Sequence, residues 1–433
     1  MYQPHLAATA EPNEDGSVWT VRLRDGVTFH DGAPLTTDAV LSTIEYINGE
    51  SLAGSGHAAT LVASGITPQA TRKLDSLTVE FELPAPDALF TELLSTFFVL
   101  PPDPDFDNPV GTGPFVFKSF DPGQEAAFTA NPEWWGSDGP WVEELILKDI
   151  EDDTARVNAL IAGQVDAISS LPYSQVAIVE STSGIQPLIN DQATTFNFLF
   201  FRTDIEPFND VRVLQAIKLV LDREEIINQA VSGYAWVGND VFGQADPAFD
   251  SSLPQRVQDI EAAKSLLAEA GMSDLSFDLT VAPIGLGVVE TCEILVTQAA
   301  KAGITVTLNH VDAATLFGPQ YMSWPAGVDV GAGTGFLTTA SYLNAPGAGY
   351  NVSHFDHPEY NELYTRARST LDVQERSELI ARMCGIVYDE DGIVIPFFPY
   401  VIDAASTKTT GWKTWKGGEF LNAGHLEQIA LVE

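Results

Sequence analysis

The central part of the chain alternates between short strand patterns and amphipathic helix patterns, and this alternation limits its fold more than any other feature. In the clearest unit, a strand pattern at 277–281 precedes a helix pattern at 288–302 and a second strand pattern at 304–308. Gly303 directly follows the helix pattern, as is typical of a helix C-terminus. Such a unit predicts parallel strands with a right-handed crossover. We therefore expect a fold of the α/β class.

The opening third of the chain has a β-rich pattern with scattered helices instead. Apolar and polar residues alternate over 19–23 and over 77–83, which is the period of a half-buried strand. Two Asp-Gly turn dipeptides, at 25–26 and 31–32, enclose a further short strand pattern. We expect a β-rich subdomain at about 15–110.

The 433 residues are too many for one hydrophobic core, since single cores stop growing at roughly 250–300 residues. We interpret the chain as two α/β lobes joined by crossing segments. The first lobe takes residues 1–194, the second takes 195–395, and residues 396–433 return to the first. The apolar stretches at 194–201 and 393–398 are the expected crossing segments.

Residues that favour helix N-termini precede several helix patterns. Thr36 or Thr37, Asp210, Asp222 and Asp259 each stand before an amphipathic run. Their short oxygen-bearing side chains can accept a hydrogen bond from a free backbone N–H of the first turn. We expect helices to start at these positions, and we expect Glu225 to complete a capping box with Asp222.

The charge of the chain excludes several classes of partner. Sixty acidic residues stand against 21 basic ones, giving a net charge of −39 and a pI of about 4.2. A field of this sign repels nucleic acids and anionic membrane surfaces. We interpret the charge as a solvated acidic shell suited to salty surroundings, where screening makes self-repulsion tolerable; an acidic face that attracts cationic ligands is the alternative.

The motifs of common enzyme classes are absent from the sequence or incomplete. A Gly-x-Ser-x-Gly elbow does not occur. Residues 111–113 lack the glycine that directly precedes the lysine of a phosphate loop, and Pro114 removes a backbone donor. The glycines at 285–287 and 331–335 do not have dinucleotide-loop spacing. We expect neither catalysis nor a cofactor, although the many carboxylates leave open a hydrolase of peptides or glycans.

Histidine and cysteine positions give little sign of a metal site. In His354-Phe355-Asp356-His357 the two histidines could share a helix face, but Pro358 favours a helix that starts at His357. We therefore expect no metal site. Cys292 and Cys384 fall on apolar faces of predicted helices, so we expect buried free thiols, and a bridge between them stays open.

Taken in order, several runs of the sequence resemble family 5 of the extracellular solute-binding proteins of ABC transporters, the peptide and nickel type. The resemblance spans essentially the whole chain. The runs that carry it are WTVRLRDGVTFHDG at 19–32, GTGPF at 111–115, NPEWW at 131–135, PFNDVRV at 207–213, LDR at 221–223, DIEAAKSLLAEAG at 259–271, YNVSHF at 350–355 and IPF at 395–397.

The resemblance implies a two-lobed, periplasmic-binding-protein-like fold of the class II type with a hinge between the lobes. It implies a monomeric solute-binding component of an ABC importer, which captures a small organic solute by hinge closure and delivers it to permease subunits in the membrane. It also implies an exported protein, in the periplasm or on the outer face of the cell membrane. A nickel or metal-chelate binder that uses His354 and His310 is the alternative within this family.

We expect solute contacts from aromatic walls and a few hydrogen-bonding groups, as in most small-molecule sites. The candidates are Asn197, Phe336, Tyr350, Asn351, His354 and Tyr400. We expect residues 111–114 to form a structural turn near the inter-lobe crossing.

The chain departs from the family pattern in three ways. No export signal precedes Pro4, so we expect the upstream reading frame to encode one together with a first strand. The segment at 97–109 is short, which predicts that the subdomain covering the cleft is reduced. Peptide-binding members commonly carry an aspartate for the ligand ammonium, whereas residues 334–339 contain no carboxylate. This absence predicts a neutral, anionic or weakly polar solute.

Overall fold

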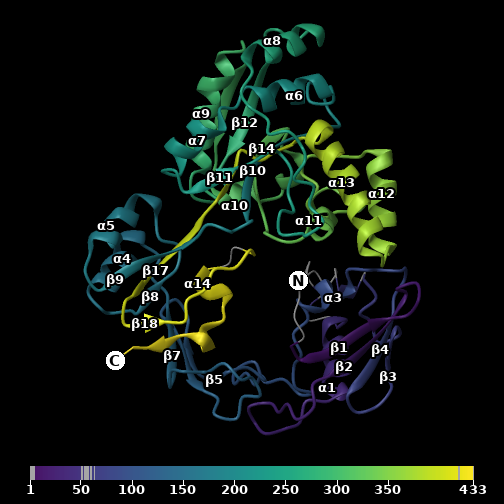
Figure 1. Ribbon diagram of the computed structural model, residues 1–433, viewed down its shortest axis with the longest axis vertical. Coiled ribbons are helices and arrows are strands. Elements are labelled where there is room, and N and C mark those ends of the chain that lie inside the picture. The colour runs from purple at the N-terminus through teal and green to yellow at the C-terminus, as the bar shows by residue number, and fades with distance from the viewer. Residues whose placement is uncertain are drawn as a thin grey trace.

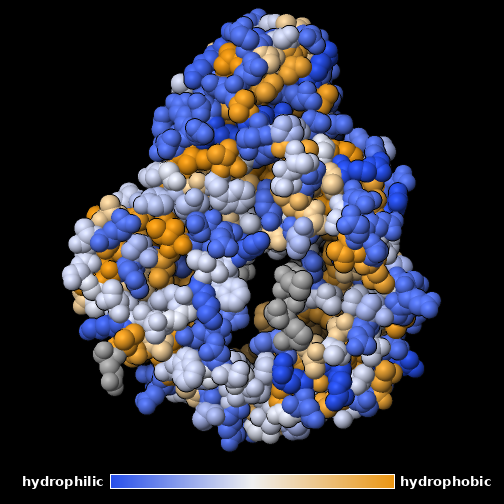
Figure 2. Space-filling model, in the orientation of Figure 1, coloured by the Kyte–Doolittle hydropathy of each residue, from blue (hydrophilic) through white to orange (hydrophobic). Residues whose placement is uncertain are grey.

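The computed structural model of the protein describes residues 5–49, 52, 58, 61, 62, 64–417 and 420–432. Two lobes and a β-rich subdomain surround a central hollow, which Figure 2 shows as an opening between them (Figure 1). The second lobe is at the top of Figure 1, the first lobe at the lower left and the subdomain at the lower right. The two-lobed α/β fold predicted from the sequence is confirmed.

The second lobe is built on a five-stranded mixed sheet in the order β13-β12-β14-β10-β15. Its strands are β10 (Phe196–Phe201), β12 (Ser276–Val281), β13 (Thr305–His310), β14 (Ala326–Gly331) and β15 (Ile393–Val394). Strand β12 is parallel to β13 and β14, and α9 (Val288–Ala300) connects β12 to β13. The predicted strand–helix–strand unit is therefore confirmed. Strand β10 is antiparallel to both of its neighbours, so the sheet is not wholly parallel.

Both faces of this sheet are covered by helices, because β10 is apolar on both sides. Phe196, Phe198 and Phe200 pack into one core, while Leu199 and Phe201 pack into the other. Burial on both faces explains why this strand is a continuous apolar run in the sequence. The helices on the first face are α11 (Phe336–Leu343), α12 (Pro358–Ser369) and α13 (Val373–Glu390), and those on the second are α6 (Val211–Leu219), α7 (Arg223–Ala230), α8 (Ile260–Glu269) and α9.

Helix starts follow the predicted capping residues. The side chains of Asp210, Asp222 and Asp259 each accept a backbone hydrogen bond in the first turn of α6, α7 and α8. His357 likewise caps α12 and accepts from Tyr360 N. The predicted capping box at α7 is incomplete, because Asp222 N donates to Gln298 rather than to Glu225. The tertiary contact with α9 replaces the local one.

The described part of the first lobe carries three small sheets. They are β8-β17-β9, the antiparallel sheet β5-β6-β7 and the antiparallel pair β18-β19. The pairing of β8 with β17 is only two residues long. The elements are β5 (Phe115–Asp121), β6 (Glu125–Ala130), β7 (Glu144–Lys148), α4 (Asp153–Ile161), β8 (Ala167–Ile168), α5 (Val176–Ser181), β9 (Ile185–Asn190), β17 (Val401–Ser406), β18 (Thr409–Thr410), α14 (Phe420–Ala423) and β19 (Ala430–Leu431).

The β-rich subdomain has a four-stranded antiparallel sheet in the order β1-β2-β4-β3. Its core is centred on Trp19, Phe81 and Phe90. A short helix, α3, lies on the side of the subdomain that faces the second lobe (Figure 1). The elements are β1 (Ala7–Pro12), β2 (Val18–Leu23), α1 (Thr37–Ile47), β3 (Thr71–Lys73), β4 (Thr78–Glu82) and α3 (Phe90–Leu94), and Thr36 caps α1.

Three of the sequence runs that resemble family 5, at 19–32, 111–115 and 131–135, meet where the β-rich subdomain joins the first lobe. His30 accepts from Gly111 N through Nδ1 at 3.2 Å and contacts Gly113 O through Nε2 at 3.0 Å. Asn131 donates to Gly113 O, and Trp135 donates from Nε1 to Thr112 O at 2.9 Å. The turn at 111–114 is therefore structural, as predicted, but it stands at this junction and not near the crossing between the lobes.

The lobes are connected by two chain crossings with aromatic side chains around them. The chain enters β10 through 191–195 and returns through β16 (Phe397–Pro399), which pairs with β11 (Ala235–Val237). The ring of Trp236 stacks on Phe398 at 4.1 Å, and its Nε1 donates to Ala193 O at 3.1 Å. Both crossings are thus tied to each other beside β11.

Three further features concern the cysteines, the helices and the metal-ligating side chains. Cys292 in α9 and Cys384 in α13 are buried and unbridged, and they pack in different cores. Among the described residues, every helix is too short or too polar to cross a lipid bilayer. Within the same part of the chain, no three histidine, cysteine or acidic side chains are grouped so that they could hold a metal ion.

Candidate functional site

The edge of the second-lobe sheet that faces the crossings is formed by the start of β10 and the end of β14, where Phe196 pairs with Gly331. The loop at 332–335 then leads into α11. A Cβ atom at Gly333 would lie 2.6 Å from both Gly417 O and Thr194 Oγ1, so this loop touches a segment of the first lobe. Thr194 donates to Lys416 O through both its backbone N and its Oγ1. The two lobes therefore meet at this edge.

Asn197 lies at this edge. It is partly buried on β10 opposite Val330, whose side chain is 45% exposed. Gly285 passes so close that a Cβ there would lie 2.9 Å from Asn197 Oδ1. Among the described residues no group is hydrogen-bonded to the amide of Asn197. The loop at 285–287 only packs against it. It is thus a polar group placed where the lobes face each other.

Tyr400 lies on the crossing, but its contacts are those of a hinge residue. Its backbone N donates to Tyr234 O at 2.9 Å, and its carbonyl accepts from the phenol of Tyr173 at 2.9 Å. Its ring packs against the core of the first lobe together with Tyr173 and Tyr234. Tyr173 and Tyr234 are themselves stacked at 5.8 Å. This aromatic cluster joins an element of each lobe.

Phe336 does not face the space between the lobes. Its side chain is fully buried, and its ring stacks on Phe242 at 5.1 Å. It packs in the same core as Phe196 and Phe242. The structure therefore gives Phe336 a packing role in place of the expected solute contact.

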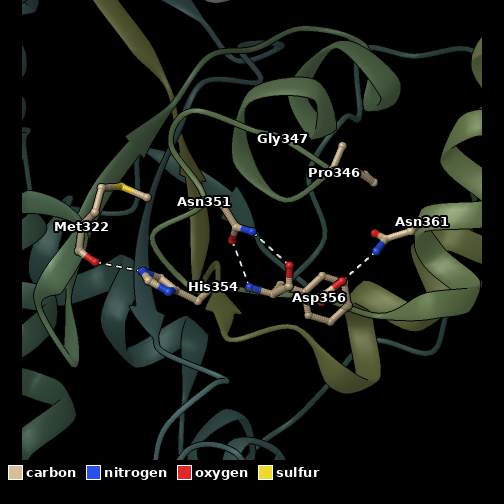
Figure 3. A pocket seen from close by; sticks show the side chains of 9 residues that line it. Met322, Pro346, Gly347, Asn351, His354, Asp356 and Asn361 are labelled. Carbon is tan, nitrogen blue, oxygen red and sulfur yellow. Dashed lines mark hydrogen bonds between the residues drawn. The ribbon is translucent and has the colours of Figure 1, made fainter.

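Asn351 and His354 come together in a pocket at the opposite end of the sheet (Figure 3). Thr203, just after β10, donates from its backbone N to Ser353 O, and Arg202 donates to Pro325 O just before β14. These are the strand ends that point away from the crossings. The pocket has a volume of about 450 Å³ and is lined by Met322, Ala345, Pro346, Gly347, Asn351, His354, Phe355, Asp356 and Asn361.

The polar side chains of this pocket are used to fold it. Asn351 donates to Phe355 O and accepts from Phe355 N, as Figure 3 shows. His354 has a left-handed backbone, with φ of 50°, and its Nε2 lies 2.8 Å from Met322 O. Tyr350 is 52% exposed and lies 6.4 Å from the ring of Tyr321, outside the pocket lining. The expected grouping of these residues with Asn197 in one cleft is therefore not what the structure shows.

Residues that the sequence analysis did not select lie at the loop before α11. Phe336 N donates to Asp246 Oδ2 at 3.2 Å, and Thr338 Oγ1 donates to Glu92 Oε2. Burial raises the pKa of Glu92, the neighbouring Asp246 raises it further, and the Thr338 hydroxyl partly offsets both. Sequence offered no signal for this group, because Glu92, Asp246 and the first turn of α11 are at least 90 residues apart along the chain.

Comparison with known proteins places these features in context. A model described as bacterial extracellular solute-binding proteins, family 5 middle, matches residues 1–351. The heme-binding protein A of Haemophilus influenzae is 24% identical, over 90% of this chain and 77% of that protein. The dipeptide-binding protein of Escherichia coli is 23% identical, over 99% of this chain and 86% of that protein.

Solved structures give the same result for the fold. The periplasmic binding protein DppA of Helicobacter pylori, in complex with the peptide STSA, superposes with a TM-score of 0.81 at 20% identity, covering 100% of this chain and 90% of that one. NikZ of Campylobacter jejuni, in complex with Ni(L-His), gives 0.82 at 21% identity, covering 99% and 91%.

Proposed function

The chain belongs to family 5 of the bacterial extracellular solute-binding proteins, the solute-binding components of ABC importers, and from this premise we propose how it holds its solute. The solute binds in the hollow between the lobes, against the edge where β10 begins and β14 ends. The observation that carries this proposal is the meeting of Gly333, Thr194 and Gly417 at that edge. A solute held there touches both lobes at once.

Binding is coupled to closure of the lobes about the aromatic hinge. A ligand shifts an open–closed equilibrium only through contacts that differ between the two states. A solute at this edge makes such contacts, because its first-lobe neighbours approach only when the lobes close. Tyr400 directly follows the returning crossing, Tyr173 and Tyr234 pack against it from the two lobes, and this cluster absorbs the rotation.

Asn197 and the loop at 332–335 contact the solute in this proposal. Asn197 supplies an amide and the loop supplies backbone groups, while Val330 supplies exposed apolar surface. Asn351, His354 and Tyr350 are not included, because they lie at the distal end of the sheet. A few polar groups on an otherwise apolar wall are typical of small-molecule sites.

The relatives are binding proteins, and we propose that this chain likewise releases its solute unchanged, as a monomer, to a membrane permease. Its place of action is the periplasm or the outer face of the cell membrane. The hydrolase alternative is not favoured, because the relatives named above are binding proteins. The metal-chelate alternative, with His354 and His310, is not favoured, because His354 is turned toward Met322 O and His310 ends β13 at the edge of the sheet.

A matched pair of variants tests the position of the site. Melting temperature is measured with a panel of di- and tripeptides, opines, sugars, heme and nickel–histidine, and any stabilising compound is taken to calorimetry. Loss of a hydrogen bond to the solute in Asn197→Ala should weaken binding about five- to a hundred-fold. Asn351→Ala is the control and should leave the affinity unchanged. Equal loss in both variants, or a chemically altered solute recovered from the complex, would contradict the proposal.

A further inference from the structure

The β-rich subdomain touches the second lobe on the side of the hollow that lies opposite the crossings. In Figure 1, α12 descends onto the subdomain at the right, whereas the crossings run from the second lobe toward the lower left. The chain passes from the subdomain into the first lobe and reaches the second lobe only through 191–195. Both cysteines are free, so the subdomain and the second lobe are held together here without a covalent link.

One ion pair spans this contact. Arg368, in the last turn of α12, donates from Nε to Asp87 Oδ1 at 3.4 Å and from Nη2 to Asp87 Oδ2. Asp87 lies between β4 and α3, and its side chain is only 8% exposed. Every other ion pair formed by the described residues joins two residues within the second lobe, within the first lobe or within the subdomain. In the described part of the chain, Asp87–Arg368 is therefore the one ion pair that connects the two bodies.

Each partner is held in position by its own side of the contact. Asp87 Oδ1 also accepts from Leu89 N at 2.9 Å, which fixes the carboxylate within the subdomain. The guanidinium of Arg368 lies 5.9 Å from the centre of the Tyr364 ring, and its Nη1 donates to the Tyr364 hydroxyl at 3.4 Å. Groups that are already ordered lose little conformational freedom when they pair. The pair is thus suited to form and break as the two bodies move.

The end of α12 makes the charge of Arg368 important. The last carbonyls of a helix have no partner within it and carry a partial negative charge. Ala88 N satisfies one of them by donating to Arg368 O at 2.7 Å. The same approach brings the Asp87 carboxylate to the negative end of the helix, which is unfavourable without a cation. Arg368 supplies this cation, so the approach of the subdomain depends on its charge.

The other contacts across this face contribute packing and one hydrogen bond. Leu89 packs against the second-lobe core, and a Cβ atom at Gly16 would lie 3.2 Å from Leu371 Cδ2, in the turn after α12. Glu92 accepts from the Thr338 hydroxyl. In a chain with a net charge of −39, two bodies that approach each other repel in general, which makes a cation between them valuable.

We propose that Asp87 and Arg368 form a latch that holds the lobes closed and sets how often the empty protein closes, an inference that rests on closure as described in the proposed function. The latch lies outside the solute contacts at Asn197 and 332–335. Because it forms only when the subdomain reaches α12, it favours closure by the same amount whatever the solute. Breaking it should lower the affinity for all solutes by one common factor and leave the preference among them unchanged.

The test follows closure in the empty protein, so it needs no identified solute. Nitroxide labels are attached after Glu82→Cys in β4 and Glu378→Cys in α13, both at exposed positions, while the buried Cys292 and Cys384 stay unlabelled. Double electron–electron resonance then gives the distribution of distances between the subdomain and the second lobe. The labelled protein should show a short-distance population that corresponds to the latched state.

Two variants remove the charges of the latch. Asp87→Asn retains an acceptor for Leu89 N, and Arg368→Gln retains a residue that favours a helix. Each should reduce the ratio of closed to open protein about three- to tenfold, as expected for a charge-assisted hydrogen bond at a partly exposed position. The double variant should lose no more than either single variant, because the two residues act as one pair. Arg366→Gln is the matched control and should retain the distances, since its partner Glu375 lies in the same lobe.

Hydrogen exchange at Ala88 reports on the same contact from the backbone. Its amide donates to Arg368 O across the gap, so exchange in the peptide 84–90 should accelerate severalfold in both latch variants and stay unchanged in Arg366→Gln. Unchanged distances in both latch variants would overturn the latch. A lower melting temperature without longer distances would also overturn it, by leaving the pair a purely structural role. Either result leaves the proposed binding edge standing, because Asn197→Ala tests that edge by calorimetry.

Discussion

The phenol of Tyr173, in the first lobe, donates a 2.9 Å hydrogen bond to the backbone carbonyl of Tyr400, on the segment that returns from the second lobe. Tyr400 N in turn donates to Tyr234 O, and the rings of Tyr173 and Tyr234 are stacked. One side chain thus holds the crossing strand against an element of each lobe. Burial also raises the pKa of Tyr173 well above its usual value, so the phenol remains a donor throughout the physiological range.

Removing this phenol should loosen the hinge. Tyr173→Phe keeps the ring stack but leaves the Tyr400 carbonyl without its donor, which should cost about 1–3 kcal/mol in the free energy of unfolding. Urea denaturation measures the loss. Tyr350→Phe is the control, since that ring is half exposed, and it should change stability by less than about 0.5 kcal/mol. Equal stability of the two variants would show that the hydrogen bond does not brace the crossing.

Asn351 should matter for stability and not for solute binding. Its side chain closes the turn before α12 through both Phe355 N and Phe355 O. Asn351→Ala should therefore lower the free energy of unfolding by about 1–3 kcal/mol, since both backbone groups lose a partner. Calorimetry with a stabilising compound from the panel should give wild-type affinity. A weakened affinity with unchanged stability would return Asn351 to the solute site.

Asp403 should make the stability of the first lobe depend on pH. Burial raises its pKa to about 6, while donation from Leu421 N and Ser170 N partly opposes the rise. The folded state then holds a proton that the unfolded state has released between pH 6 and pH 4. Stability relative to Asp403→Asn should therefore increase as the pH falls through this window.

The gain should reach about 3 kcal/mol at most, because one pKa unit corresponds to roughly 1.4 kcal/mol. Denaturation of the wild type and Asp403→Asn at pH 7, 6, 5 and 4 measures it. Asp121→Asn, at an exposed position of β5, provides the control for the general effect of removing a carboxylate. Parallel stability profiles for wild type and Asp403→Asn would refute the assignment.

The excess of acidic residues should make stability depend on salt. With 60 acidic residues against 21 basic ones, self-repulsion of the folded chain is strong when it is not screened. The melting temperature should rise substantially from low to molar potassium chloride, since screening shortens the range of repulsion from tens of ångströms to about 3 Å. A flat or falling curve over that range would remove the interpretation of the acidic shell as an adaptation to salt.

Much of the local structure could be predicted from the sequence because it depends on neighbours along the chain. The caps at Asp210, Asp222 and Asp259 and the helix start at His357 are contacts within one turn. The β12–α9–β13 unit follows from hydrophobic period and chain length alone. The capping box at Asp222 shows the limit, because Gln298 from another helix takes the place of Glu225.

The location of the candidate site could not be predicted from neighbouring residues in the sequence. Asn351 and His354 are close to each other in sequence and share a pocket, but which end of the sheet this pocket occupies depends on the direction of β10. Phe336 is adjacent to the facing loop, yet the core of α11 turns its ring away from solvent. Sequence gave the residue types of a site without its location.

By itself, the sequence determined the α/β class, the helix starts, the two apolar crossings and the family resemblance, because each depends on periodicity or on short runs of residues. Only the tertiary structure decided which groups lie where the lobes meet. Gly333 comes against Thr194 and Gly417 at the edge of the second-lobe sheet, which brings together segments more than 80 residues apart along the chain. A site of this kind depends on distances in space, and these are not encoded in any single stretch of the chain.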